Sequence, residues 1–223
     1  DDGVVVTTGG NPGGSEVHTT TAGGTALSSV SQTTFTARYG HAIARVPGNA
    51  DAFLVVGGYG SGNKNDALLT EDRGVSFVEK SNSVFTSGRM GTALVATGPA
   101  TFVAYGGYGS GGYSNEVRQS TNSGVDWTTL RAEGGGGGEC SGDAAMWSVR
   151  NSIAYAYMPL RNRILLAGGY GSFSIYKEDV WGSDDGGTCW FELTWNSDGS
   201  ASSGYHGASL VVATLGGVEI LVL

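Results

Sequence analysis

Charged side chains are scarce in this chain of 223 residues, where they make up 14% and where 12 basic residues face 20 acidic ones. The formal net charge of −8 argues against free nucleic acid as a partner, because phosphate binding needs a basic surface. No stretch approaches the roughly 18 consecutive apolar residues that indicate a membrane-spanning helix. We therefore expect neither nucleic-acid binding nor membrane insertion.

Cysteine and histidine are equally scarce, with two and three copies. An even cysteine count in a chain of this composition predicts an oxidised, secreted or cell-surface protein. We expect a disulfide between Cys140 and Cys189, because the insert that carries Cys140 is long enough to reach along the edge of the fold; two separate thiols are the alternative. The histidines do not converge in any ligand pattern, so we predict no metal site and no cofactor.

Glycine, in contrast, is abundant, with 40 copies, and one phrase occurs three times. Gly-Gly-Tyr-Gly-Ser stands at residues 57–61, 106–110 and 168–172. A period of roughly fifty residues indicates an array of similar structural units. We divide the single domain, residues 1–223, into units of about 1–37, 38–87, 88–148 and 149–203, with a partial unit at 204–223.

Each unit repeats the same order of parts. An apolar run ends in the double glycine, an acidic or amide pair follows, and a turn of the form Ser/Thr-x-Asp/Asn-x-Gly-x-x-aromatic comes next. The pattern predicts four short strands per unit, with glycine at the turns and the aromatic residue buried between sheets. The third, fifth and eighth residues of the three turns are Asp72, Gly74 and Phe77; Asn122, Gly124 and Trp127; and Asp185, Gly187 and Trp190.

These motifs resemble two families of repeat at once. Arg38-Tyr-Gly-His, the apolar run into the double glycine and the later Asn65-Asp66 resemble Kelch repeats, whereas the Ser-x-Asp-x-Gly-x-x-Trp turn resembles the Asp-box, or BNR repeat, of sialidase-type proteins. The resemblance covers nearly the whole chain and implies an all-β fold, a β-propeller of four-stranded antiparallel blades. Both motifs are architectural, so they imply no activity.

The two ends of the chain are expected to fall inside blades. Residues 3–8 read as the second strand of a blade, and residues 208–213 and 219–223 read as an inner strand and a second strand. We expect an incomplete segment of a larger propeller. The alternative is completion of the terminal blades between copies of the chain.

Two sets of repeated residues are candidates for ligand binding. Arg38, Arg89 and Arg150 occupy equivalent positions and could bind a carboxylate or sulfate, in an arrangement similar to the arginine cluster of sialidases. We favour the alternative, in which they make structural contacts between blades. The other set comprises the tyrosines of the repeated phrase, on loops where binding residues concentrate: Tyr59, Tyr108 and Tyr170.

The sequence isolates no catalytic residue from its ten tyrosines and many acids. We therefore predict a non-catalytic extracellular propeller, a structural or interaction module that binds a protein or glycan through its blade loops. One alternative is a sialidase-like or other glycan-active enzyme, which needs carboxylates, or a carboxylate and a tyrosine, converging beside the arginines. The other is a subunit of an extracellular filament joined by inter-chain blade completion.

Overall fold

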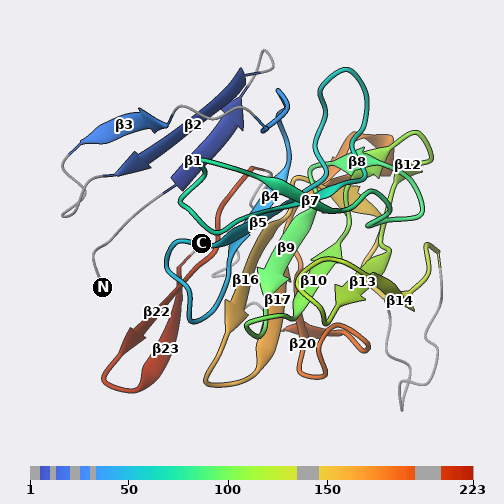
Figure 1. The fold of residues 1–223 in the computed structure, drawn as a ribbon. Helices are drawn as coiled ribbons and strands as arrows, with labels where there is room; N and C mark the ends of the chain where they lie inside the picture. Colours follow the sequence, from blue (N-terminus) through green and yellow to red (C-terminus); the bar gives the residue numbers. More distant parts are fainter. Residues whose placement is uncertain are drawn as a thin grey trace.

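The computed structural model describes residues 6–10, 14–20, 26–30, 34–134, 146–193 and 207–222, and it consists almost entirely of antiparallel sheets (Figure 1). The helix of the described residues is a single 3-10 turn, Ser172–Ser174. Three sheets have four strands each. They are β4 (Ala42–Arg45), β5 (Phe53–Val56), β6 (Ala67–Thr70) and β7 (Val78–Ser81); β9 (Ala93–Ala96), β10 (Phe102–Tyr105), β13 (Val117–Ser120) and β14 (Thr128–Arg131); and β16 (Ala154–Met158), β17 (Arg163–Ala167), β20 (Val180–Ser183) and β21 (Phe191–Leu193).

The prediction of an all-β fold with four-stranded antiparallel sheets is thus confirmed. In each sheet the strands pair in chain order, as the repeat pattern predicts. One detail differs: the aromatic residue of each turn precedes the fourth strand instead of lying within it. The fourth strands begin one residue later, at Val78, Thr128 and Phe191.

Smaller sheets stand at the two ends of the described chain. The first contains β1 (Val6–Gly10), β2 (Gly14–Thr20) and β3 (Leu27–Val30), and the last is a hairpin of β22 (Val211–Leu215) and β23 (Val218–Val222). The two strands of this hairpin differ by a few residues from the predicted ranges 208–213 and 219–223, because Gly216 and Gly217, both with positive φ, form a two-residue turn between them. Among the described residues, no strand pairing joins these two sheets.

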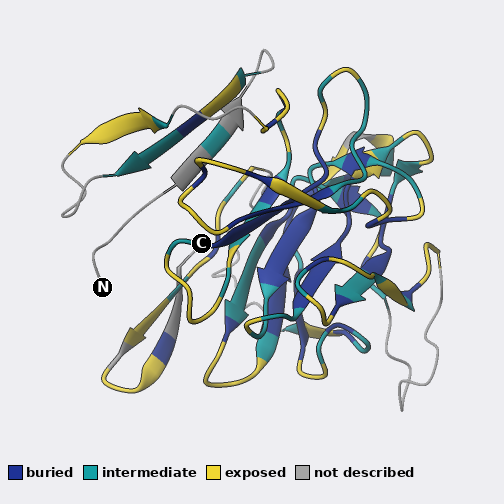
Figure 2. Cartoon of the chain, viewed as in Figure 1, coloured by how far each residue is buried: buried dark blue, intermediate teal, exposed yellow. Residues whose placement is uncertain are grey.

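Consecutive sheets pack through their first strands. Strand β4 lies beside β9, β9 beside β16, and β16 beside β22 (Figure 1). Each of the first three strands carries a fully buried alanine, Ala42, Ala93 or Ala154, and such small side chains allow neighbouring strands to approach closely. Figure 2 shows the result: buried strands in the middle of the molecule and exposed residues on the outer strands and turns.

Apolar side chains fill the spaces between neighbouring sheets. Val17 of β2 packs with Phe53, Val55 and Leu68 of the next sheet. The same mode repeats along the molecule, because each further cluster combines residues of two successive sheets. The hydrophobic core is therefore a series of layers between sheets, as expected for an array of units that each bury one face on a neighbour.

A chain of main-chain hydrogen bonds joins equivalent residues of successive units. The amide of Gly91 donates to the carbonyl of Gly40 at 2.6 Å, the amide of Ser152 to Gly91 at 2.9 Å, and the amide of Gly207 to Ser152 at 3.3 Å. All four residues have φ between 51° and 65°. The left-handed backbone thus recurs at the same place in each unit, and we name this chain of bonds the inter-unit joint.

The three repeated turns have one hydrogen-bond pattern. In the last of them, Ser183 Oγ accepts from the amide of Gly187 at 2.9 Å, Asp185 accepts from the amide of Cys189 at 2.9 Å, and the indole of Trp190 donates to Gly187 O at 2.9 Å. The turns around Asp72 and Asn122 repeat the first two bonds, and Trp127 repeats the third.

Glycine at the fifth turn position has a geometric cause. Gly74 has φ of 89°, and a Cβ there would lie 2.6 Å from Cγ1 of Val17 in the preceding sheet. Gly124 and Gly187 likewise face side chains of the preceding sheet. The turn therefore closes its own hairpin and also presses against its neighbour.

Candidate functional site

The arginines that open the units are buried and fully occupied by partners. Arg38 and Arg150 have no exposed surface, and Arg89 is 2% exposed. Both terminal nitrogens of Arg38 donate to the carboxylate of Asp66, at 2.7 and 2.8 Å, and one also donates to the carbonyl of Gly57 at 3.0 Å. Arg150 repeats this arrangement with Asp179 and with the carbonyl of Gly168.

The middle arginine uses a different acid. Arg89 donates to Glu116 Oε2 at 2.8 Å and to the hydroxyl of Ser114, and its guanidinium lies 4.6 Å from the ring centre of Phe85. Glu116 is only 1% exposed and also accepts from Thr86 Oγ1 at 2.7 Å. Burial lowers the pKa of Arg89, and the negative charge of Glu116 opposes that effect.

These contacts determine which guanidinium N–H donors are available to a ligand. In Arg38 and Arg150, every N–H donor of the guanidinium bonds to a carboxylate, carbonyl or hydroxyl of the protein. Burial tends to raise the pKa of Asp179, but the hydrogen bonds and charge of Arg150 outweigh it, so that pKa is lowered. The arginines thus make structural contacts, but their carboxylate partners lie in the same unit and not in a neighbouring blade as expected. An anion would have to displace these carboxylates to reach them.

The tyrosines of the repeated phrase have a different environment, since Tyr59 and Tyr108 are each 38% exposed. Tyr108 and Tyr170 belong to two short sheets, β8 (Arg89–Met90) with β11 (Tyr108–Gly109) and β12 (Gly112–Tyr113), and β15 (Arg150–Asn151) with β18 (Tyr170–Gly171) and β19 (Ile175–Tyr176). The sequence predicts loops here, and the structure has two-residue strands instead. Cross-strand pairing opposes Tyr108 to Tyr113 and Tyr170 to Tyr176.

The four rings form a continuous row across two units. Ring centres are 4.8 Å apart between Tyr108 and Tyr113, 5.8 Å between Tyr113 and Tyr170, and 5.2 Å between Tyr170 and Tyr176. Neighbouring ring planes are inclined by 53°, 66° and 53°. We name these residues the tyrosine row. It joins two predicted candidates, Tyr108 and Tyr170, to two tyrosines that the sequence pattern does not single out, Tyr113 and Tyr176.

The preceding unit shows how the row ends. There Tyr59 pairs with Asn63, which occupies the position of Tyr113 and Tyr176, and the ring of Tyr59 lies 5.5 Å from that of Tyr39. An alignment of Asn63, Tyr113 and Tyr176 could have identified the missed tyrosines. Their distance from the repeated phrase grows by one residue in each unit, and this drift concealed the correspondence.

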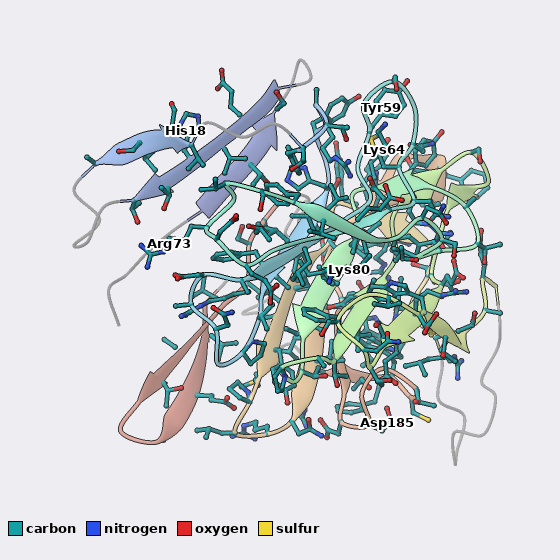
Figure 3. All side chains as sticks on the ribbon, viewed as in Figure 1. His18, Tyr59, Lys64, Arg73, Lys80 and Asp185 are labelled. Atoms are coloured by element: carbon teal, nitrogen blue, oxygen red, sulfur yellow. The ribbon has the colours of Figure 1, made fainter. Side chains whose placement is uncertain are left out.

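Exposed apolar side chains also occur in the turn and strand that follow Tyr170. Phe173 is 94% exposed at a φ of 62°, and Ile175 and Tyr176 are 48% and 45% exposed. Partial desolvation and the phenol groups of Tyr170 and Tyr108 raise the pKa of Tyr113 above its ordinary value. Figure 3 shows Tyr59 and Lys64 at one end of the molecule and Asp185 at the opposite end. The loop of the first repeated phrase and the turn around Asp185 therefore lie at opposite ends.

Histidines and cysteines contribute little to this surface. His41 lies between the first two sheets, with Nε2 2.6 Å from Thr8 Oγ1, and burial followed by the charge of Arg38 lowers its pKa from 6.5 to about 4. The described residues contain no cluster of His, Cys, Asp or Glu able to hold a metal ion. Cys140 lies outside the described residues, so its disulfide with the half-buried Cys189 stays a prediction.

Comparison with protein families finds no family model that matches the chain, and comparison with curated proteins finds no similar sequence. Among the described residues, no helix is long and apolar enough to cross a membrane.

Proposed function

We propose that this protein is a non-catalytic β-propeller that acts outside the cell as an interaction module, with the tyrosine row as its binding surface. The observation that carries the proposal is the row itself, four adjacent tyrosine rings. Tyrosine supplies a large, rigid contact area with a polar tip, and few side-chain torsions have to be fixed on binding. Proteins and glycans are both partners that such a surface suits.

Three features support the propeller part of the proposal. The four-stranded sheets pair in chain order, their first strands lie side by side, and the inter-unit joint repeats from one unit to the next. The turn geometry also agrees with the resemblance to Asp-box repeats. The two cysteines and the abundance of Gly, Ser and Thr support the extracellular setting.

The glycan-active alternative has no comparable support in the described part of the chain. A sialidase-like site needs guanidinium groups that face the ligand, and Arg38, Arg89 and Arg150 are instead buried with carboxylates of their own units. Burial of the arginines and their pairing with carboxylates therefore favour a scaffold role for these side chains.

Binding to arrays of glycans and of peptides tests the proposed function, with the native chain compared with Tyr113→Ala. We expect at least one class of ligand to bind the native chain and to lose most of its signal with the variant. Tyr59→Ala is the matched control, because Tyr59 has the same place in the repeat and the same 38% exposure as Tyr108 but lies outside the row. Turnover of aryl glycosides by the native chain, or array binding that Tyr113→Ala leaves intact, would contradict the proposal.

A further inference from the structure

The two tyrosines of the β11–β12 sheet form the closest pair in the row. Ring centres of Tyr108 and Tyr113 are 4.8 Å apart, whereas the other tyrosine pairs with ring contacts in the described part of the chain are 5.2 Å or more apart. Antiparallel pairing sets the two residues directly opposite each other. Directly opposed residues share one face of a sheet, so the backbone itself holds the two phenols together.

Solvent reaches this pair. Tyr108 is 38% exposed and Tyr113 is half-buried, and β12 lies at the periphery of the molecule (Figure 1). Partial desolvation raises the pKa of Tyr113, and the phenols of Tyr170 and Tyr108 add to the effect. That electrostatic contribution requires the hydroxyl end of Tyr108 to lie near that of Tyr113. The ring carbons next to the hydroxyls, at which phenol radicals couple, are therefore close together as well.

A pair of tyrosines in the core shows what ring contact alone lacks. Tyr105 and Tyr155 have ring centres 6.5 Å apart, but Tyr105 has no exposed surface, and its hydroxyl donates to the carbonyl of Leu165 at 2.9 Å. Neither an oxidant nor the water that takes up a phenol proton reaches that hydroxyl. A reaction between phenols is therefore expected at the surface pair and not in the core.

We infer that Tyr108 and Tyr113 are the site of an intramolecular dityrosine crosslink, formed when hydrogen peroxide and a haem peroxidase oxidise the two phenols. Each phenol gives up one electron and one proton, and the two radicals form a carbon–carbon bond between the ring carbons next to the hydroxyls. The coupled carbons then lose their hydrogens as protons, the oxygens regain protons, and both rings become aromatic again. In sum, two phenols and one hydrogen peroxide give one dityrosine and two waters.

The turn between the two strands permits this bond. Gly111 and Gly112 have no atom within 4 Å of an added Cβ, so the space around them is open. The hairpin can therefore make the small shift that brings the coupling carbons together without disturbing a neighbouring unit. The crosslink fixes the conformation of the second repeated-phrase loop, whether or not the row binds a ligand.

Treatment of the native chain with hydrogen peroxide and a haem peroxidase, at a low protein concentration, tests the inference. We expect a monomeric product that is lighter by two hydrogen atoms and has dityrosine fluorescence, and tandem mass spectrometry should place the link between Tyr108 and Tyr113. Tyr108→Phe and Tyr113→Phe keep the rings and should each lose this link. Tyr157→Phe is the matched control and should keep the native yield, because the hydroxyl of Tyr157 donates to Asn162 Oδ1 at 2.8 Å and lies outside the row.

Several outcomes would overturn the inference. Links found only between chains, or between Tyr105 and Tyr155, would place the reaction elsewhere. Native yields of the link in Tyr108→Phe, or oxidised chains that gain oxygen and contain no dityrosine, would show that the two phenols do not couple. Array binding that depends on Tyr113 tests the proposed function separately, and its result leaves this inference unchanged.

Discussion

At the scale of single residues, the buried ion pairs are the contacts whose loss should cost most. Arg89 and Glu116 are 2% and 1% exposed, whereas Arg73 and Asp51, which also form a pair, are 48% and 41% exposed. A buried charge whose partner is removed has neither water nor a counter-charge. An exposed charge regains water.

We therefore predict that Arg89→Ala lowers the free energy of unfolding by about 3 kcal/mol, because buried Glu116 loses its closer guanidinium partner and keeps only Arg118, at 3.4 Å. The control is Arg73→Ala, at the exposed arginine labelled in Figure 3. It should lower the free energy of unfolding by less than about 1 kcal/mol. Urea unfolding monitored by tryptophan fluorescence measures both. Equal losses in the two variants would show that the buried pair is no more important than the surface pair.

His41 predicts a dependence of stability on pH. Its pKa is lowered from 6.5 to about 4, so the folded state favours the neutral ring. The stabilisation is fully present above pH 6.5 and is lost as the pH falls through about 4. The loss amounts to about 3 kcal/mol once the ring is charged.

The variant His41→Gln separates this effect from the acids that titrate nearby in pH, such as Asp179. Glutamine does not titrate, so we expect the variant to lose less free energy of unfolding between pH 7 and pH 4 than the native chain does. Urea unfolding at a series of pH values gives the comparison. Parallel declines in both proteins would assign the acid sensitivity to other groups.

At the scale of strands and turns, glycines with close neighbours control how sheets meet. Gly57 has φ of 63°, and a Cβ there would lie 2.7 Å from the carbonyl oxygen of Arg89, a backbone atom of the next unit. Gly48 has φ of 84° and nothing within 4 Å of the same construction. The two positions share the backbone strain and differ in the contact.

We predict that Gly48→Ala costs about 1 kcal/mol, the strain of an L-residue in the left-handed region. Gly57→Ala should cost about 1–3 kcal/mol more, because the added methyl group pushes two units apart. Thermal unfolding of the two variants checks the difference. If both variants unfold at the same temperature, the contact between Gly57 and Arg89 does not determine the spacing of the units.

The longer strands are the part of the fold that the sequence predicts well. Apolar runs between glycine turns correctly predicted the central strands, because their periodicity and their turn chemistry agree. The short strands around Tyr108 and Tyr170 were missed, since two-residue strands leave no periodic pattern. The same limit applied to the candidate site: the repeated phrase identified two members of the tyrosine row, but Tyr113 and Tyr176 join it only through cross-strand pairing.

At the scale of the whole molecule, the protection of backbone amides from hydrogen exchange should follow the layered core. Strands β5 and β10 are buried along their whole length, whereas most of β3 is exposed. An element with neighbours on both faces opens only when two layers are disrupted, but an end element opens alone.

We therefore predict that amides of β5 and β10 exchange slowest with deuterium, and that β3 exchanges fastest among the strands of its own and the neighbouring sheet. Native-state hydrogen exchange followed by mass spectrometry measures this gradient. Uniform protection across these strands would mean that the sheets open as a single cooperative unit.

The inter-unit joint has a consequence for how such a chain can evolve. Its bonds run between main-chain groups of Gly40, Gly91, Ser152 and Gly207, so they require a backbone shape and no particular side-chain pair. A unit copied within the gene brings both halves of this connection with it. Duplication or loss of a whole unit therefore disturbs the connection less than a side-chain interlock would, and repeat number becomes a heritable variable that selection can change stepwise.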